Sequence, residues 1–259
     1  MSEATTQTVT ACLLIIGDEI LSGRTRDANL AYLAKWLNEE GIVLREARVI
    51  PDIEAVIVAT VREVKAKFDY VFTTGGIGPT HDDITASCVA KAFDTPLAFS
   101  DEAAAELMAR LAGPLNEGRR RMAMIPKGAR LIKNRISGAP GFVIGNVHVM
   151  AGIPQVMQAM LETLRGALKG GRKVETAAIH VYAGESFMAP TLTQVQGRYP
   201  DVAIGSYPFA HDDKYGASLV LRSADPARLA AALGDLRSAL AEAGFLPLDG
   251  EAPPHRGAN

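Results

Sequence analysis

The sequence has few cysteines, no excess of either charge and no long hydrophobic run. Two cysteines in 259 residues, Cys12 and Cys88, cannot build the disulfide framework of a small secreted domain. Lysine and arginine number 27 against 29 acidic residues, so the net charge of −2 favours neither nucleic acid nor an acidic membrane surface as a partner. The apolar run 11–16 is too short to cross a bilayer, and no basic region precedes it. These absences predict a cytoplasmic protein that binds neither nucleic acid nor membrane.

Short apolar runs alternate with amphipathic segments along the first two thirds of the chain. The run Val9–Ile16 is almost continuously apolar, as in a strand that is buried on both faces of a parallel sheet. The alternation with helical segments predicts an α/β fold with three α/β/α layers around a mostly parallel sheet. The predicted strands are 9–16, 42–50, 69–74, 129–132, 141–144 and 146–150, and the predicted helices are 29–40, a segment capped by Asp52 and ending near 67, 83–93, 101–112, 116–124 and 153–168.

A polar break with two glycines, 169–173, precedes a segment with a different order of elements. Strand 174–182, helix 186–198, strands 202–206 and 217–223 and helix 226–243 indicate a small α+β domain, in which 207–216 forms a long hairpin link. We therefore divide the chain into a disordered N-terminus (1–8), an α/β/α domain (9–170), an α+β domain (171–249) and a flexible tail (250–259).

The segment 73–85, TTGGIGPTHDDIT, places a glycine-rich turn between a predicted strand and a predicted helix. Ligands of open α/β sheets bind beyond the carboxyl ends of the strands, and glycines leave the backbone accessible there. The start of the following helix adds a partial positive charge. The segment lacks the Gly-Lys-Ser/Thr of a P-loop, and His81 stands where a dinucleotide fingerprint requires its third glycine. We predict a binding site for a phosphorylated small molecule.

Carboxylates gather at the same predicted edge of the sheet. Asp82 and Asp83 follow the glycine loop, Asp18 and Glu19 follow the first strand, and Asp52 follows the second. A divalent metal between the carboxylates and a phosphate would offset their repulsion, so Asp82 and Asp83 are predicted metal ligands. Helix capping is the alternative for either of them, and for Asp52 a simple helix cap is the favoured interpretation. For Asp18 and Glu19 the alternative is a solvated turn.

Several segments of the sequence resemble those of a known protein family. The stretch GDEILSGRTRDANLAYLAKWL, the loop TTGGIGPTHDDIT, and the later APGF and GIPQVM are similar to the molybdopterin-binding (MoaB/Mog-type) domain. The similarity covers about 9–168 and is strongest to the branch found in competence/damage-inducible protein A and in the N-terminal half of eukaryotic FAD synthases. The segment IGSYP resembles the small domain that follows in both.

The resemblance implies a homo-oligomer, dimer or trimer, that binds a phosphorylated pterin such as molybdopterin or an ADP-type compound. It also implies hydrolysis of ADP-ribose or FAD with Mg, Mn or Co, and it places Asp83 and Asp52 at functionally important positions. The chain departs from the family at 137–138, where it has Ser-Gly in place of Gly-Thr, and at Gln155–Val156, where the family has a glutamate in the motif.

From the residues and the resemblance together we predict a metal-dependent pyrophosphohydrolase. A non-catalytic molybdopterin or nucleotide carrier, and an adenylyl transferase of molybdenum-cofactor biosynthesis, remain as alternatives. The predicted catalytic residues are Asp83, Asp52 and Asp18, and the predicted ligand-binding residues are Thr74, Gly75, Gly76, Gly78, Pro79, Thr80, Gly17, Ser137 and Gly138.

Overall fold

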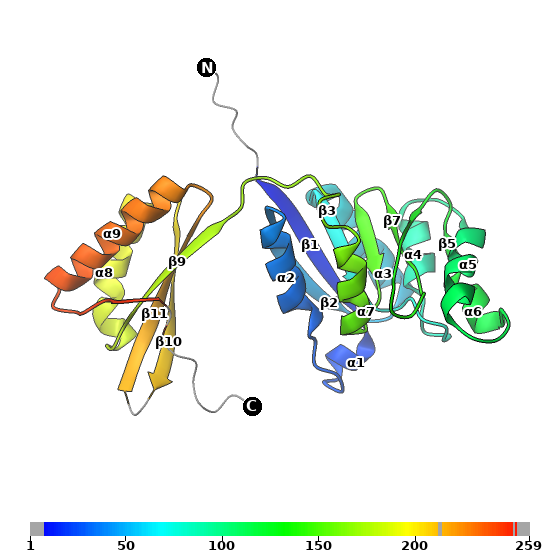
Figure 1. Cartoon of the computed structure of the whole chain (residues 1–259), viewed down its shortest axis with the longest axis horizontal. Helices are drawn as coiled ribbons and strands as arrows, with labels where there is room; N and C mark the ends of the chain where they lie inside the picture. The colour runs from blue at the N-terminus through cyan, green and yellow to red at the C-terminus, as the bar shows by residue number, and fades with distance from the viewer. Residues whose placement is uncertain (1–7, 212–213, 251, 253–259) are drawn as a thin grey trace, which may run out of the picture. The chain divides into compact units, whose positions relative to one another are not determined.

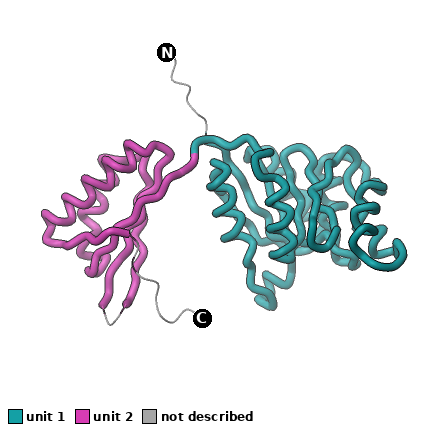
Figure 2. The backbone as a smooth tube through the Cα atoms, in the orientation of Figure 1, with its two compact units in different colours: residues 1–172 teal, residues 173–259 magenta. Residues whose placement is uncertain are grey.

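The computed structural model describes residues 8–211, 214–250 and 252 (Figure 1). The chain divides into two compact units, 1–172 and 173–259 (Figure 2). The predictions of a disordered segment 1–8 and of a tail 250–259 lie largely outside the described residues, as do Asp212 and Asp213 of the predicted hairpin link.

The first unit is built on one six-stranded sheet. Its strands are, in sheet order, β2 (Ile42–Ile50), β1 (Val9–Ile16), β3 (Tyr70–Thr74), β8 (Val147–Met150), β7 (Gly141–Ile144) and β6 (Arg130–Ile132). The first four strands run parallel, whereas β7 and β6 join antiparallel at the edge. The predicted mostly parallel α/β sheet is therefore confirmed.

Helices cover both faces of this sheet. The helices that cover it are α2 (Asn29–Glu39), α3 (Glu54–Lys67), α4 (Thr85–Ala92) and α7 (Pro154–Glu162). Apolar residues of α3 and α4 pack on one face, and those of α2 and α7 pack on the other. Three further helices, α1 (Asp18–Leu21), α5 (Asp101–Arg110) and α6 (Glu117–Met122), and a hairpin of β4 (Leu97–Phe99) and β5 (Met124–Pro126) complete the unit.

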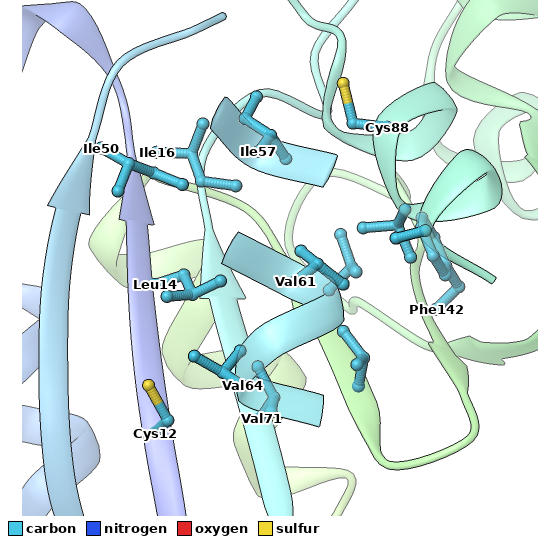
Figure 3. Packing of buried hydrophobic residues seen from close by; sticks show 14 of the residues in the cluster. Cys12, Leu14, Ile16, Ile50, Ile57, Val61, Val64, Val71, Cys88 and Phe142 are labelled. Atoms are coloured by element: carbon cyan, nitrogen blue, oxygen red, sulfur yellow. The ribbon is translucent and has the colours of Figure 1, made fainter. Parts of the chain in front are cut away.

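Strand β1 lies inside the sheet and supplies both cores. Its side chains alternate, so Leu14 and Ile16 join the core beneath α3, and Leu13 joins the core beneath α2. Figure 3 shows Leu14 and Ile16 beside Ile57 and Val61 of α3. Full burial of each such side chain stabilises the fold by about 1.5–3 kcal/mol. Because both faces of β1 are buried, its sequence has to be continuously apolar.

The second unit is a four-stranded sheet with order β10-β11-β9-β12 and helices α8 and α9 packed against one face. All its strand pairs are antiparallel. The carboxylate of Asp225 caps α9 as expected, because it accepts hydrogen bonds from the amides of Ala227 and Arg228. The bounds are β9 (Glu175–Val181), α8 (Glu185–Arg198), β10 (Ala203–His211), β11 (Lys214–Ser223), α9 (Pro226–Glu242) and β12 (Leu248–Asp249).

Some predicted elements were wrong in their extent. The segment 207–216 is not a long link, because β10 continues to His211 and β11 starts at Lys214, with nine residue pairs in register between them. Strands β4 and β5 were not predicted, since three residues give too short a pattern. None of the helices in the described residues is long and apolar enough to span a membrane.

Candidate functional site

The glycine loop follows β3 directly and is folded tightly onto its surroundings. Gly75 and Gly76 have φ values of +100° and +67°, which glycine adopts without steric cost. A Cβ at Gly75 would lie 2.1 Å from the carbonyl oxygen of Ile16, and one at Gly76 would lie 2.1 Å from Thr85 Oγ1. The Thr85 hydroxyl donates to the carbonyl of Gly75 at 3.0 Å. The two glycines therefore allow the loop to turn back against the start of α4.

Asp83 closes the turn of the same loop. Its Oδ2 accepts hydrogen bonds from the amide of Thr80 at 2.8 Å and from the Thr80 hydroxyl at 2.6 Å. The predicted helix start at 83 was wrong, because α4 begins at Thr85 and the residue that caps it is Ile84. Asp82 lies on the exposed side of this turn, with His81 3.9 Å away.

Asp52 does not cap the helix that follows it. The residue before α3 is Ile53, whereas Asp52 Oδ2 accepts a hydrogen bond of 2.9 Å from the amide of Asp18 at the start of α1. Burial raises the pKa of Asp52, and the negative charges of Asp18, Glu19 and Asp82 raise it further, while the Asp18 amide lowers it. Carboxylates from three loops thus act on one another at this edge, as the sequence predicted.

A cavity of about 530 Å³ opens beside the glycine loop. One side consists of the loop itself, and most of the remaining wall is apolar, as is usual for sites that hold flat organic ligands. The lining residues are Glu19, Thr25, Gly75, Gly76, Ile77, Gly78, Pro79, Asp83, Leu111, Met122, Ser137, Ala139, Ala151, Gly152, Ile153, Pro154 and Val156.

The structure brings only some of the predicted site residues to this cavity. Those that line it are Gly75, Gly76, Gly78, Pro79, Asp83 and Ser137. Thr74 lines a smaller neighbouring pocket. The predicted residues that line neither are Gly17, Asp18, Asp52, Thr80, Asp82 and Gly138.

Gly17 and Gly138, which line neither pocket, allow close contacts in the segments around them. A Cβ on Gly17 would lie 2.6 Å from the carboxylate oxygens of Glu19, and one on Gly138 would lie 2.8 Å from the carbonyl of Glu106 in α5. Gly17 thus lets the Glu19 side chain fold back, and Gly138 lets the 134–139 loop pack on α5. Their roles in the structure are to hold the cavity walls.

Ser137 is held by an asparagine that the sequence did not single out. The Nδ2 of buried Asn134 donates to Ser137 Oγ at 2.6 Å and to the carbonyl of Ala139 at 3.1 Å. Its Oδ1 accepts from the amides of Ile136 and Ser137 at 2.8 and 3.2 Å. Since the Ala139 amide also donates to Ser137 Oγ, that hydroxyl keeps its own proton for a ligand.

Other wall residues were also missed. Glu19 stood in a motif quoted for the resemblance but was not among the predicted binding residues, and the same is true of Ile153 and Pro154. Leu111 and Met122 come from the α5–α6 segment, far from any motif, so only their packing reveals them.

Two of three consecutive arginines, Arg119 and Arg121, make different contacts. The guanidinium of Arg119 donates to the carbonyls of Ala112, Gly113 and Pro114 and so closes the α5–α6 turn. Arg121 donates to the carbonyl of Thr80 at 2.8 Å and ties α6 to the glycine loop.

The donor atoms near the cavity limit which metal ion they can hold. Within the described part of the chain, no three His, Cys, Asp or Glu side chains converge as a metal site. The carboxylates of the site are hard oxygen donors, and magnesium is commonly held by one or two carboxylates together with substrate phosphates. The residues present fit an ion of that kind when a phosphorylated ligand completes its coordination.

In a comparison with known proteins, the two units of the chain match two different families. Residues 12–170 match the family described as "probable molybdopterin binding domain", and residues 173–249 match "FAD synthase, middle domain". A crystal structure of the protein CinA, of unknown function, from Thermoplasma acidophilum superposes with a TM-score of 0.58 at 32% identity, covering 62% of this chain and 98% of that one.

The share of the relative that this chain covers differs from one relative to the next. A CinA-like protein of Citrifermentans bemidjiense is 40% identical over 157 residues, which are 58% of this chain and 38% of that protein. A probable FAD synthase of Caenorhabditis elegans is 31% identical over 262 residues, covering 91% of this chain and 50% of the relative. A protein of Pyrococcus furiosus is 34% identical, with 76% of this chain and 84% of the relative covered.

Proposed function

The chain belongs to the family of molybdopterin-binding domains, and from this premise we propose that it hydrolyses the diphosphate of an ADP-containing compound such as ADP-ribose or FAD. The observation that carries the proposal is the cavity of about 530 Å³, where a glycine loop, a carboxylate and an apolar wall meet. The loop and Ser137 suit a phosphate, and the apolar wall suits an adenine or flavin ring. The relative named probable FAD synthase supports FAD as one of these ligands.

A divalent ion such as Mg²⁺, Mn²⁺ or Co²⁺ would neutralise the diphosphate and favour hydroxide over water. Asp83, which lines the cavity, and Asp82, which precedes it, are the residues that would hold it. Asp83 keeps Oδ1 for that purpose, because Oδ2 is engaged by Thr80.

Glu19 is the carboxylate of the α1 segment that reaches the cavity, so we assign it the orientation of the attacking water. Water adds to one phosphorus atom of the diphosphate, and the bond from that phosphorus to the bridging oxygen breaks. The products are AMP and the phosphate ester of the other half of the substrate. The water proton passes to Glu19. Asp52, through its hydrogen bond to the Asp18 amide, holds the α1 segment in place.

The deciding experiment incubates the full chain with ADP-ribose or FAD and each metal, and measures AMP. We expect AMP from the wild type, at least a hundredfold less from Asp83→Asn, and ligand affinity within about tenfold of wild type in that variant. Asp235→Asn is a matched control, because it makes the same substitution on the exposed face of α9 in the second unit. No AMP with any metal would remove the hydrolase proposal.

The alternative is a protein that binds molybdopterin or a nucleotide without turning it over. It is supported by the description of the matching family, which names binding and no reaction. In that case molybdopterin or ADP binds while AMP release stays at the uncatalysed rate. An adenylyl transferase would instead join AMP from ATP to molybdopterin. The family resemblance also supports a dimer or trimer, which analytical ultracentrifugation would establish.

A further inference from the structure

Helix α6 packs directly on the glycine loop. A Cβ on Gly118 would lie 3.1 Å from the Cβ of Pro79, and the Arg121 guanidinium donates to the carbonyl of Thr80 at 2.8 Å. Residues three positions apart in a helix lie on the same side of it, so Gly118 and Arg121 both face the loop. The packing of α6 thus directs a basic side chain to the segment that we expect to hold a phosphate.

A further pocket of about 20 Å³ adjoins the large cavity at this contact. The pocket and the cavity share Gly76, Gly78 and Asp83, and Arg121 lines the pocket. One water needs roughly 10–15 Å³ of such space, so the pocket admits a single group of the size of an oxygen atom. A phosphate on the glycine loop can therefore place one of its oxygens beside Arg121.

The charges around the cavity call for a positive partner of this kind. The charged residues among the described ones that line the cavity are Glu19 and Asp83, and both are acidic. A diphosphate brings further negative charge next to these carboxylates, and Asp83 lines the small pocket as well. The guanidinium of Arg121 offsets that repulsion at the position where the phosphate oxygen would lie.

The Arg121 side chain can still bind a ligand, and its direction is already fixed. A guanidinium presents several N–H donors in one plane, and the Thr80 carbonyl accepts from Nη1. Several arginines of the described residues form ion pairs with carboxylates, whereas this hydrogen bond of Arg121 is to a neutral acceptor. Because the contact with Thr80 orders the side chain in advance, a ligand bears less of the entropic cost of ordering it.

The two arginines that precede Arg121 make contacts elsewhere. Arg119 donates to three carbonyls of the α5–α6 turn, and the guanidinium carbon of Arg120 lies 4.9 Å from the centroid of the Phe99 ring. Of the three consecutive arginines, Arg121 is the one that lines the pocket within the described part of the chain. The other two provide controls of the same residue type in the same helix.

We propose that Arg121 binds a non-bridging oxygen of the phosphate that lies on the glycine loop and thereby selects phosphorylated ligands. The proposal rests on the proposed function for the identity of the ligand, but it concerns binding and not turnover. The guanidinium donates to the phosphate oxygen from the side of the small pocket. Planar guanidinium groups are well suited to phosphate because they combine a permanent positive charge with aligned donors.

Three variants separate a phosphate contact from a purely structural contact with Thr80. Arg121→Lys keeps a donor and the positive charge, Arg121→Gln keeps a donor for the Thr80 carbonyl without the charge, and Arg121→Met keeps neither. Arg120→Gln is the matched control, because it removes the charge one position earlier, from a side chain directed at Phe99. Affinities are measured by isothermal titration calorimetry of the full chain in Mg²⁺ with α,β-methylene-ADP, whose bridging carbon prevents hydrolysis.

We expect Arg121→Gln and Arg121→Met each to weaken binding of this analogue about tenfold. That is the lower end of the range for a hydrogen bond to a charged group, since Arg121 is exposed to solvent. Arg121→Lys should weaken binding by no more than about threefold, and Arg120→Gln should leave it unchanged. A purely structural role predicts instead that the Lys and Gln variants bind alike and that the Met variant alone is impaired.

Equal affinities of Arg121→Lys and Arg121→Gln would overturn the proposal, and so would equal effects of Arg120→Gln and Arg121→Gln or the absence of wild-type binding at millimolar concentration. The outcome is separate from catalysis. Binding that depends on the charge at 121, without AMP release from ADP-ribose, removes the hydrolase and keeps the role of Arg121. AMP release by the wild type, with Arg121→Lys and Arg121→Gln binding alike, does the reverse.

Discussion

Replacement of Asn134 by alanine tests how the wall around Ser137 is held. Asn134 is 3% exposed and uses both its donors and both its acceptor positions within 136–139. Each net hydrogen bond contributes about 0.5–1.5 kcal/mol. The amides of Ile136 and Ser137 can recruit water at this loop, so we expect the lower part of the range, a loss of about 2–3 kcal/mol from the free energy of unfolding.

The assay uses the single tryptophan of the chain. Trp36 is buried in α2, so its fluorescence during urea denaturation reports the first unit without a contribution from the second. Asn146→Ala is the matched control, because Asn146 Nδ2 donates two hydrogen bonds, to the carbonyls of Lys65 and Phe68, away from the cavity.

We expect Asn146→Ala to cost about half as much stability, since it removes half as many hydrogen bonds, and to leave ADP affinity unchanged. Asn134→Ala should also weaken ADP, because the Ser137 hydroxyl loses its fixed direction. A loss below about 0.5 kcal/mol for Asn134→Ala, or equal ligand affinity in the two variants, would refute the reasoning.

Three further changes have expected outcomes. The folded state raises the pKa of Asp52, so the protonated carboxyl stabilises the fold at low pH, and this stabilisation is lost as the pH rises through the raised pKa. Asp52→Asn should therefore raise Tm at pH 7. The gain in Tm should vanish below pH 3.8, where the carboxyl is protonated in both the folded and the unfolded state. Gly76→Ala should lower the free energy of unfolding by about 2–4 kcal/mol, and adding Thr85→Ala should recover part of it, as urea titration will show. Burial raises the pKa of Cys12 and of Cys88 to about 11, so a disulfide reagent at pH 8 should label neither thiol until the protein is unfolded.

The sequence was sufficient to predict the parallel core, because the spacing of apolar residues alone determines where its strands and helices lie. Strands β1 and β2 have the predicted bounds, and the buried faces of β1 follow from its apolar run. The gathering of acidic side chains at one edge followed from the common direction of parallel strands. These inferences need only local pattern and sheet topology.

The contacts within the site could not be read from the pattern. Aspartate near a predicted helix start is normally a cap, yet Asp52 bonds to the amide of Asp18 thirty-four positions earlier. The residues around Leu111 and Asn134 reach the cavity only through the fold of long connections. Hydrogen bonds between distant loops depend on tertiary geometry, for which a single sequence provides no spacing rule.

Strand β10 forms an edge of its sheet, and its sequence limits what can add to that edge. The Ile204 amide points away from β11, since it donates to Gln196 Oε1. The alternating amides at 206, 208 and 210 share that direction, and Pro208 has no N–H to donate. Two of four outward donors are thus withheld from any incoming strand. The β10 edge of the second unit is thereby a poor template for edge-to-edge pairing with another copy of the chain.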